Sequence, residues 1–518
     1  MVRRPSRLLL TLALAVPGAA PGGVLHLDTT PATHVLFLDL LEVENLENAE
    51  LVVEAAAKHP ASPVLPLGDL YDWDALQARP WGGTLLYDRE ERLFKCWYVG
   101  IGHSRDLRDL RGGYATSRDG IAWEKPRLGL HEFGGGRDNN IVHPSGDLRV
   151  VKDPAEPDPT RRYQMLSARA GTAGKFGETY FPFYSSDGIH WTPGPDVQIS
   201  PHIEIHQILF DPLERDPRRR IKTYGKLGKQ KASKPGPAVV RKIAVGLGPD
   251  IEHQEPSPAN PILDPDDGLE HELHFASVFP YRGYYLMLYN YNRYADYHDQ
   301  GLWGRFVGDV RLAVSRDGEH FRRVNAHQPV IRRGERGTWD SGFLVMANAV
   351  DHDGRVYLYY SAGDESWGSW PADNAKPGRP TTRTLGGFSR SAQMGLALLP
   401  ADGFTHLRAR DGYGPGIATT VPIEVRDPAR ASLRLALGGG MPYRNWVEVE
   451  VLDAATGRPL PGFTRTDCVD LAGDGASLPV EWAGGRTTLA DVGVPTIRLR
   501  FHLFGEARLR SFHFAGPP

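Results

Sequence analysis

A short turn sequence that recurs at long, regular intervals constrains the fold of this chain more than any other feature. The segment Ser-Arg-Asp-Gly-Ile-Ala-Trp around Asp119 returns in similar form around Asp187 and Asp317. Asp-Gly favours a tight turn, because the Asp side chain bonds nearby backbone and Gly accepts positive φ. Asp119 and Asp187 stand 68 positions apart, and Asp187 and Asp317 stand 130 apart, nearly twice as far. A long period of this kind predicts a repeat architecture.

Two weaker copies complete the series. One lies around Asp250, midway between the second and third strong copies, and another at Asp402 follows after a longer interval. Each turn is preceded by three short apolar segments, so each unit is predicted to form three or four antiparallel strands. Such units cannot bury their faces alone, and radial repetition is one way to bury them. Five units predict a five-bladed β-propeller.

The pattern of repeated apolar segments and turns ends at about residue 412. Segments 446–451 and 497–503 alternate apolar with charged or polar residues, as strands with one buried face do. The last hundred or so residues therefore read as an antiparallel β-sandwich, and the chain as all-β. The expected division is a signal peptide at 1–22, a lead-in segment at 23–62, the five-bladed propeller at 63–415 and the sandwich at 416–518.

The first residues have the organisation of a signal peptide. Three arginines precede an apolar run at 8–16, and small residues follow at 18–20. The run is too short to span a bilayer, and no second run of spanning length follows, so no membrane span is expected. We expect a secreted or periplasmic protein, with a lipid-anchored or uncleaved segment as the alternative.

The net charge and the cysteine content limit which binding partners and which disulfide bonds are expected. Over 518 residues the net charge is −3, which gives no reason to expect a nucleic acid or a membrane surface as partner. Cys96 and Cys468 are the two cysteines of the chain. An oxidising compartment would permit a disulfide between them, but two separate buried thiols are the favoured interpretation.

In a propeller the first strand of each unit lines the central channel, so polar side chains at the starts of these strands converge at one end. Carboxylates that point into an enclosed channel are costly unless they have partners or a task. Two carboxylates that flank a sugar can act as general acid and as base or nucleophile. The catalytic candidates on this basis are Glu272, Asp74, Asp340 and Glu204.

Strand alternation places His202, Glu204 and His206 on one face, and His274 follows a similar pattern in the next unit. These side chains could hold a channel metal ion, since imidazole and carboxylate suit several divalent cations. Their spacing is not diagnostic of a metal, so plain hydrogen bonding is favoured over a metal site and no cofactor is required.

Aromatic and basic residues near the strand starts are candidates for holding a carbohydrate substrate. Aromatic faces stack on sugar rings, and arginine anchors hydroxyl or carboxylate groups. Loop packing is the alternative for those in the loop after the fourth hairpin and in the Gly- and Pro-rich insertion at 363–387. The substrate-binding candidates are His206, His274, Trp73, Arg293, Trp303, Trp367 and Trp370.

Five repeats with these turns, followed by a sandwich, resemble the five-bladed propeller glycoside hydrolases related to families 32 and 43. The resemblance covers nearly the whole mature chain and implies sugar-active chemistry. The nucleophile motif, the R-D-P motif and the E-C motif of family 32 are not intact here. Trp73-Asp74 loosely matches the first and Lys152-Asp153-Pro154 superficially the second, while Glu272 stands near where the acid-bearing strand would be.

The leading hypothesis is a secreted glycoside hydrolase that acts on a poly- or oligosaccharide through paired carboxylates in the channel. Glu272 is expected to be the general acid, Asp74 or Asp340 the base or nucleophile, and Glu204 a residue that orients the sugar. A non-catalytic carbohydrate-binding propeller is the first alternative, and a structural or protein-binding propeller the second.

Overall fold

The computed structural model describes residues 24–27, 33–102, 110–146, 148–168, 180–197, 199, 203–231, 239–265, 270, 273–294, 306–364 and 392–516. These residues form strands, turns and short 3-10 segments, with no α-helix in the described ranges, and the all-β prediction is confirmed. The chain divides into a larger unit, Leu51–Phe279 with Tyr285–His406, and a smaller unit made of the remainder. No membrane-crossing helix is found in the described part of the chain.

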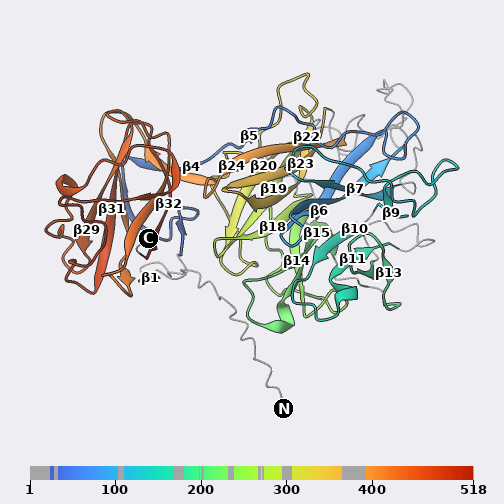
Figure 1. The fold of residues 1–518 in the computed structure, drawn as a ribbon, viewed down its shortest axis with the longest axis horizontal. Helices are drawn as coiled ribbons and strands as arrows, with labels where there is room; N and C mark the ends of the chain where they lie inside the picture. The colour runs from blue at the N-terminus through green and yellow to red at the C-terminus, as the bar shows by residue number, and fades with distance from the viewer. Residues whose placement is uncertain are drawn as a thin grey trace, which may run out of the picture. The chain divides into compact units, whose positions relative to one another are not determined.

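The strands of the larger unit form five four-stranded antiparallel groups (Figure 1). Two groups are separate sheets, and the other three are joined edge to edge by short parallel pairings. The groups, in chain order, are β6 (Gln77–Asp88), β7 (Leu93–Ile101), β8 (Arg111–Ser117) and β9 (Ile141–His143); β10 (Leu148–Lys152), β11 (Tyr163–Ser167), β12 (Phe181–Ser185) and β13 (Thr192–Pro193); β14 (Ile203–Phe210), β15 (Ile221–Lys231), β16 (Val239–Gly248) and β17 (Glu255–Pro256); β18 (Ala276–Tyr281), β19 (Tyr284–Tyr294), β20 (Phe306–Ser315) and β21 (Arg322–Arg323); and β22 (Phe343–His352), β23 (Arg355–Gly363), β24 (Ala392–Pro400) and β5 (Ala57–Lys58).

Hydrogen bonds link the first strands of the second, third, fourth and fifth groups one after another. Arg149 on β10 donates to the carbonyl of Ile205 on β14 at 2.6 Å. The Gln207 side chain on β14 both donates to and accepts from the backbone of Val278 on β18. β18 donates in turn to the carbonyl of Ala347 on β22 through a serine hydroxyl. The fifth group returns to the first, because a β23 serine donates to a β6 carbonyl at 2.8 Å.

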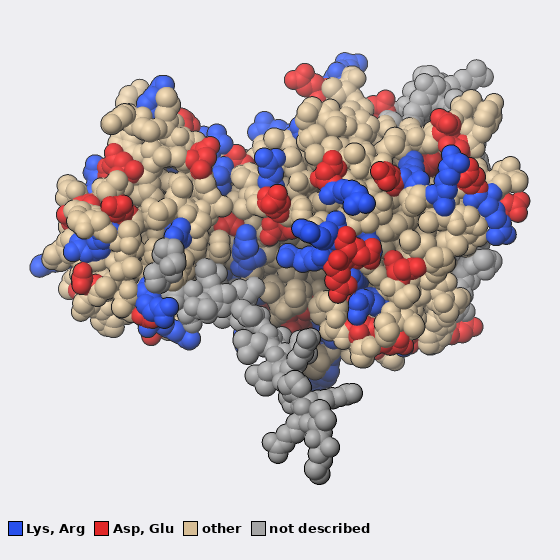
Figure 2. Space-filling view, in the orientation of Figure 1, with Lys and Arg blue, Asp and Glu red and all other residues tan. Residues whose placement is uncertain are grey.

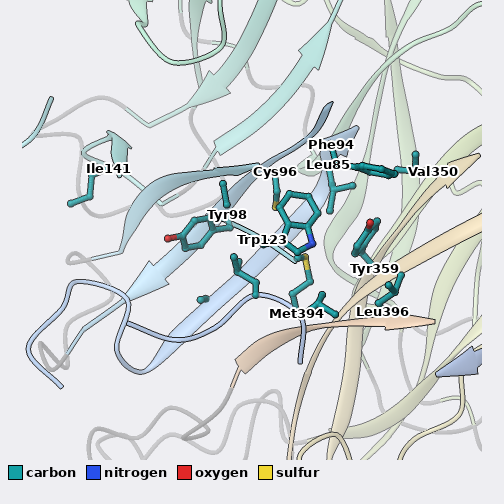
Figure 3. Close-up of a cluster of buried hydrophobic side chains, with 14 of the residues drawn as sticks. Leu85, Phe94, Cys96, Tyr98, Trp123, Ile141, Val350, Tyr359, Met394 and Leu396 are labelled. Atoms are coloured by element: carbon teal, nitrogen blue, oxygen red, sulfur yellow. The ribbon is translucent and has the colours of Figure 1, made fainter. Parts of the chain in front are cut away.

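The hydrophobic core follows the same order, since each cluster of buried side chains joins neighbouring groups. One cluster joins the first and fifth groups, with Phe94, Trp123, Tyr359 and Met394 in contact (Figure 3). Other clusters join the first group with the second, the second with the third, and the third with the fourth. A further one combines residues of the first, fourth and fifth groups. The propeller architecture follows from this closed order, and the blade number of five stays a prediction.

The recurring turn links adjacent groups. In the turns at Asp119, Asp187 and Asp317, the carboxylate accepts two backbone N–H groups, and the glycine that follows has φ between 74° and 79°. The carbonyl of each glycine accepts a hydrogen bond from an aromatic side chain on the second strand of the preceding group. These three donor and acceptor pairs are Tyr359 to Gly120 (2.7 Å), Trp97 to Gly188 (2.6 Å) and Tyr224 to Gly318 (2.9 Å).

The two weaker copies of the turn differ from each other. Asp250 accepts the N–H groups of Glu252 and His253, as the strong copies do. Asp402 instead has a positive φ of 58° itself and is fully buried. The glycine no longer takes the left-handed conformation there, so the fifth turn has a different geometry from the expected one.

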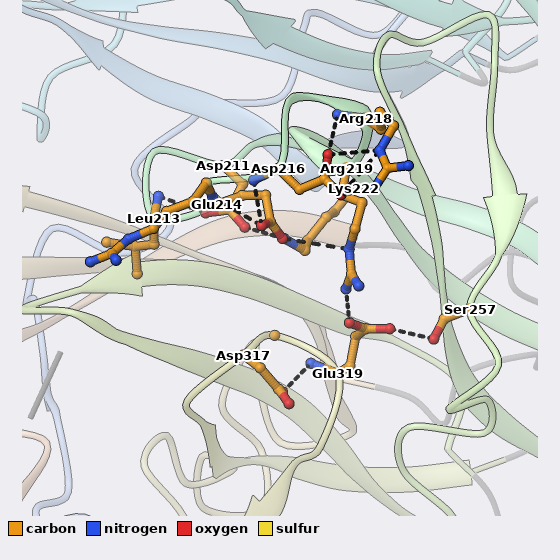
Figure 4. A network of polar contacts seen from close by, with 12 residues as sticks. Asp211, Leu213, Glu214, Asp216, Arg218, Arg219, Lys222, Ser257, Asp317 and Glu319 are labelled. Atoms are coloured by element: carbon orange, nitrogen blue, oxygen red, sulfur yellow. Dashed lines mark hydrogen bonds and ion pairs between the residues drawn. The ribbon is translucent and has the colours of Figure 1, made fainter. Parts of the chain in front are cut away.

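The aspartates at the hairpins after the first strands also link adjacent groups. Asp88 accepts from Tyr163 of the second group at 2.6 Å, and Asp211 accepts from Tyr285 of the fourth group at 2.8 Å. A buried lysine on the second strand of the same group pairs with each carboxylate, as Lys222 does with Asp211 (Figure 4). These hairpin aspartates therefore join neighbouring groups through charge-assisted hydrogen bonds.

The basic stretch at 218–220 is occupied by internal ion pairs. It overlaps the short 3-10 segment η3 (Pro217–Arg219), whose counterpart in the second group is η2 (Pro159–Arg161). Arg219 pairs with Glu319 of the fourth group (Figure 4), and Arg220 pairs with Asp153 of the second at 2.6 Å. These pairs favour a structural role over an anion-binding patch.

The smaller unit contains two six-stranded sheets, confirming the predicted β-sandwich, although β1 pairs in parallel with β27. The alternating segments bury one face, because Val447, Val449, Val451, Leu499 and Phe501 are all fully buried. The sheets, with the 3-10 segment η4 (Arg465–Asp467), comprise β1 (Leu25–Leu27), β27 (Ile423–Val425), β31 (Thr496–Phe504), β26 (Gly416–Thr420), β3 (Val43–Glu47) and β29 (Trp446–Asp453); and β30 (Gly475–Pro479), β28 (Ser432–Gly438), β32 (Arg508–Ala515), β25 (Thr405–Ala409), β4 (Ala49–Val53) and β2 (Val35–Leu36).

The described part of the expected lead-in belongs to both units. Strands β1 to β4 are members of the sandwich sheets, while β5 is the outermost strand of the fifth propeller group. The expected signal peptide at 1–22 lies outside the described residues. Cys96 and Cys468 are both free thiols.

The link between the fifth and first groups can be tested with Tyr359→Phe, which removes the hydroxyl donor and keeps the ring. We expect the free energy of unfolding to fall by about 1–2 kcal/mol, because the buried Gly120 carbonyl loses its partner. Urea unfolding followed by tryptophan fluorescence measures this. Tyr357→Phe on the same strand, where the side chain is only partly buried, is the matched control. An equal effect of both substitutions would contradict the assignment.

The turn carboxylates predict an acid-sensitive stability. Burial alone would raise the pKa of Asp187, but hydrogen bonds from His190 and from backbone N–H groups lower it to about 2. The folded pKa lies below the value of about 3.9 in an unfolded chain. The stabilisation is therefore present above pH 4 and is lost as the pH falls through about 2. Asp187→Asn should flatten this acid-induced loss in urea titrations, whereas Asp138→Asn at an exposed position should leave the wild-type profile.

Candidate active site

Polar side chains at the beginnings of three first strands and their neighbours form a buried group that we call the axial cluster. It is defined as Arg79 on β6, Arg149 on β10, Glu204 and His206 on β14, Lys226 on β15 and His274 just before β18. All are buried except Glu204, whose side chain is 26% exposed. Glu204 is therefore the member of the cluster whose side chain is exposed to solvent.

Strand register sets the first contact of this cluster. Glu204 and Lys226 are direct cross-strand partners in the β14–β15 ladder. The Lys226 Nζ atom lies 2.9 Å from Glu204 Oε1 and 2.7 Å from His274 Nε2. One ammonium group thus connects the carboxylate of the third group with an imidazole of the fourth.

A β-bulge directs His206 inward. The β14–β15 register shifts between Ile205 and Gln207, so His206 has no ladder partner, and bulges of this kind re-aim a side chain. The His206 ring is fully buried, and its centroid lies 5.2 Å from that of Phe275. Neither ring nitrogen has a hydrogen-bond partner within the described part of the chain.

Both imidazoles are held in the neutral form. Burial lowers the pKa of His206 and of His274 well below the usual value, and the positive charge of Lys226 lowers both further. A neutral His274 can accept a hydrogen bond at Nε2 from the Lys226 ammonium group, which agrees with the 2.7 Å between these two nitrogens. The 3.9 Å approach of His206 Nε2 to Glu204 Oε1 is accordingly a polar contact and not an ion pair.

Two arginines add positive charge on the neighbouring strands. Burial, and then the charge of Arg149, lowers the pKa of Arg79 to about 9, so Arg79 remains charged at neutral pH. Arg149 also lowers the pKa of His206 through its charge. Guanidinium groups on two neighbouring strands therefore add positive charge near His206.

The backbones of β6 and β14 approach each other closely beside His206. A Cβ atom built on Gly82 of β6 would lie 2.8 Å from the His206 carbonyl oxygen, closer than side chains tolerate. Gly82 is thus required for β6 to pass beside β14. This close approach limits the room along the axis at this level.

Asp74 and Asp340 share one setting in two different groups. Asp74 pairs with Lys125 at 2.6 Å and accepts from the Tyr98 hydroxyl at 2.7 Å. Asp340 pairs with Lys58 and accepts from the Tyr360 hydroxyl at 3.1 Å. Both carboxylates are almost fully buried.

The tryptophans that precede these aspartates repeat as well. Trp73 stacks on Tyr98 with ring centroids 5.3 Å apart, and Trp339 stacks on Tyr360 at 6.0 Å. Trp73 is buried and donates to Asn140, so its ring is used in packing. This repeated Trp-Asp arrangement fixes the loops before β6 and β22, which suits a structural role.

Of the predicted site residues, the structure brings Glu204, His206 and His274 together. Several others, namely Glu272, His202, Trp303, Trp367 and Trp370, lie outside the described residues, and for Arg293 only the backbone is described. Among the described residues, no group of three His, Cys, Asp or Glu side chains is arranged to hold a metal ion. The channel metal near His202, Glu204 and His206 therefore stays untested.

Comparison with known proteins gives fold likenesses at low identity. No family model matches the chain, and no curated protein matches its sequence. A solved structure described as a glycoside hydrolase is 14% identical, with a TM-score of 0.43, and covers 68% of this chain and 92% of its own. A glycosyl hydrolase from Bacteroides ovatus is 14% identical, with a TM-score of 0.41 over 67% of this chain and 94% of its own. A fructofuranosidase from Schwanniomyces occidentalis, complexed with fructosylnystose, is 10% identical, with a TM-score of 0.37 over 87% of this chain and 98% of its own.

Sequence reasoning missed Arg79, Arg149 and Lys226. Lys226 has no neighbour in the sequence that marks it as a site residue, and only the strand register shows that it faces Glu204. The two arginines stand inside first strands, where alternation alone does not mark them as neighbours.

The role of Lys226 can be tested through the histidines. Lys226→Met removes the positive charge that disfavours the imidazolium form, so the pKa of His274 should rise toward its usual value while burial keeps it depressed. Titration of ¹³C-labelled histidine by NMR measures the shift. Lys125→Met, which removes a partly buried lysine paired with Asp74, is the control and should leave His274 unchanged. If the pKa of His274 were the same in Lys226→Met as in the wild type, the ammonium and imidazole groups would not be in contact.

Proposed function

We propose that this protein is a secreted or periplasmic carbohydrate-active enzyme that hydrolyses glycosidic bonds at the axial cluster. The observation that carries the proposal is the part-exposed Glu204 carboxylate, held 2.9 Å from Lys226 in an otherwise buried polar site. A carboxylate that is exposed to solvent where the first strands begin can reach a bound sugar, and glycoside hydrolysis requires carboxylates placed beside the sugar. The resemblance of the repeats to propeller glycoside hydrolases favours the same reaction class.

We assign the acid role to Glu272. It stands two positions before His274, whose Nε2 is 2.7 Å from Lys226, and next to Leu273, which is fully buried. Desolvation would favour the protonated form of its carboxyl group, as an acid catalyst needs. The acid would donate its proton to the glycosidic oxygen, and the leaving sugar would depart as an alcohol.

The second carboxylate of the pair is Glu204. Its ammonium partner suits the ionised role, either as a nucleophile at the anomeric carbon or as a base that takes a proton from water. Asp74 and Asp340, the other candidates, are each bound to a lysine and a tyrosine in a repeated loop. Those partners favour Glu204 over both for chemistry.

The surrounding residues have supporting roles. Neutral His206 and His274 offer hydrogen bonds to sugar hydroxyls without adding charge, and Phe275 provides an apolar ring 4.2 Å from His274, measured between centroids. On the face shown in Figure 2, basic and acidic side chains are intermixed, which suits an uncharged or locally charged glycan more than a nucleic acid. A binding propeller without catalysis is the second candidate, since Glu204 alone would anchor a glycan.

Activity on a panel of aryl-glycosides and polysaccharides tests the reaction. On a cleaved substrate, Glu272→Gln and Glu204→Gln should each lower kcat by roughly a hundredfold or more, as the loss of one catalytic carboxylate does. Binding should change by only a few fold, since Gln retains the shape. Glu132→Gln, at an exposed position, is the matched control. Full activity of both variants would refute the assignment, and binding without any turnover across the panel would favour the binding propeller.

A further inference from the structure

The loop that precedes β6 carries two adjacent apolar side chains that are exposed to solvent. Leu70 is 61% exposed and Tyr71 is 85% exposed, whereas Trp73 and Asp74, which follow them closely, are buried. An exposed apolar side chain contributes little to folding, because it removes almost no surface from water.

A loop with the same hydrogen bonds forms before β22 without these side chains. The three backbone N–H to carbonyl bonds are Gly68 to Asp74, Asp72 to Asp69 and Ala75 to Asp72 in the first loop, and Gly334 to Asp340, Thr338 to Glu335 and Ser341 to Thr338 in the second. Leu70 and Tyr71 are replaced there by Arg336 and Gly337. The backbones differ at the second of these positions, where Gly337 has a positive φ of 97°, yet all three bonds are retained. Leu70 and Tyr71 are therefore not required for such a loop to fold.

The loop lies at the end of the first strands where the axial cluster is found. Leu76, the last residue before β6, packs against a cluster of buried side chains that contains Phe275. The centroid of the Phe275 ring lies 5.2 Å from that of His206. Glu204, the exposed carboxylate of the axial cluster, stands near the start of β14. Two exposed apolar side chains and an exposed carboxylate therefore occur at the same end of the first strands.

The loop is anchored, so Tyr71 is presented on a fixed support. Trp73 donates to the side chain of Asn140 at 3.1 Å, and Lys125 donates to the Asp74 carboxylate at 2.6 Å. An aromatic side chain on a fixed support loses little conformational freedom when it binds a ligand. A tyrosine ring has an apolar face and a polar tip, which suits a sugar ring with an apolar face and hydroxyl groups at its edge.

We propose that Tyr71, assisted by Leu70, stacks on a sugar unit next to the unit that is held at Glu204. This inference rests on the proposed function and specifies its substrate as an oligosaccharide or polysaccharide that is recognised over at least two units. Tyr71 is a positioning residue in this assignment and takes no part in the chemical step. A single sugar unit at Glu204 makes no contact with it.

The length of the substrate tests this inference. The probes are gluco-, manno-, galacto- and xylo-oligosaccharides of two to six units, together with the glycosyl fluorides of the same sugars, whose leaving group is a single atom. In Tyr71→Ala, KM for cleaved oligosaccharides and Kd from titration calorimetry should rise roughly tenfold, as expected for the loss of one aromatic contact. The kcat/KM for the glycosyl fluorides should stay within about twofold of the wild-type value. Tyr71→Phe retains the ring and should behave like the wild type.

A loop exchange and a matched control separate loss of contact from loss of structure. Combining Leu70→Arg with Tyr71→Gly gives the loop the residues of its counterpart before β22. This double variant should weaken oligosaccharide binding as Tyr71→Ala does, and its free energy of unfolding in urea should equal that of the wild type. Tyr413→Ala, at a fully exposed tyrosine of the smaller unit, is the matched control and should bind every oligosaccharide like the wild type.

Equal Kd and KM for the wild type and Tyr71→Ala at every chain length would overturn the inference, as would a wild-type protein that binds none of these oligosaccharides. An equal loss for oligosaccharides and glycosyl fluorides would also overturn it, because Tyr71 would then act at the cleaved unit. Failure of the proposed function is distinguishable. Oligosaccharides that bind, lose affinity in Tyr71→Ala and are never cleaved retain the inference and remove the hydrolase, whereas cleavage that is indifferent to Tyr71→Ala does the reverse.

Discussion

The propeller depends on one hydrogen bond that recurs around the ring. An aromatic side chain on the second strand of one group donates to the carbonyl of the turn glycine in the next, as Trp97 does to Gly188 and Tyr359 to Gly120. The carbonyl is available because the glycine takes a positive φ while the Asp carboxylate holds the backbone N–H groups that follow. A local turn sequence is thereby converted into a contact between groups, and the contact from Tyr359 joins the end of the repeat series to its beginning.

The candidate site is a consequence of that closure. Once the first strands lie beside one another, the polar residues at their starts are brought together, although they are far apart in the chain. The bulge between Ile205 and Gln207 then turns His206 inward, and the glycine at position 82 allows β6 to approach it.

The sequence was informative where local chemistry determines structure. Asp119, Asp187 and Asp317 form the expected turns, and the alternation around Val449 and Phe501 identifies buried sandwich faces. The sequence was less informative where the structure depends on pairing between strands that are far apart in the chain. Asp402 has its own backbone geometry, and β5 is a two-residue strand without periodicity. Glu204, His206 and His274 were recognised from alternation, but their partner Lys226 depends on strand register, which no local pattern reveals.

A crystal structure of Glu272→Gln with a bound oligosaccharide substrate is the most direct test of the proposed function. We expect a sugar ring within hydrogen-bond distance of His206, with Glu204 facing the same ring. An oligosaccharide bound away from the axial cluster, or bound there with Glu204 turned away from the sugar, would contradict the proposed function.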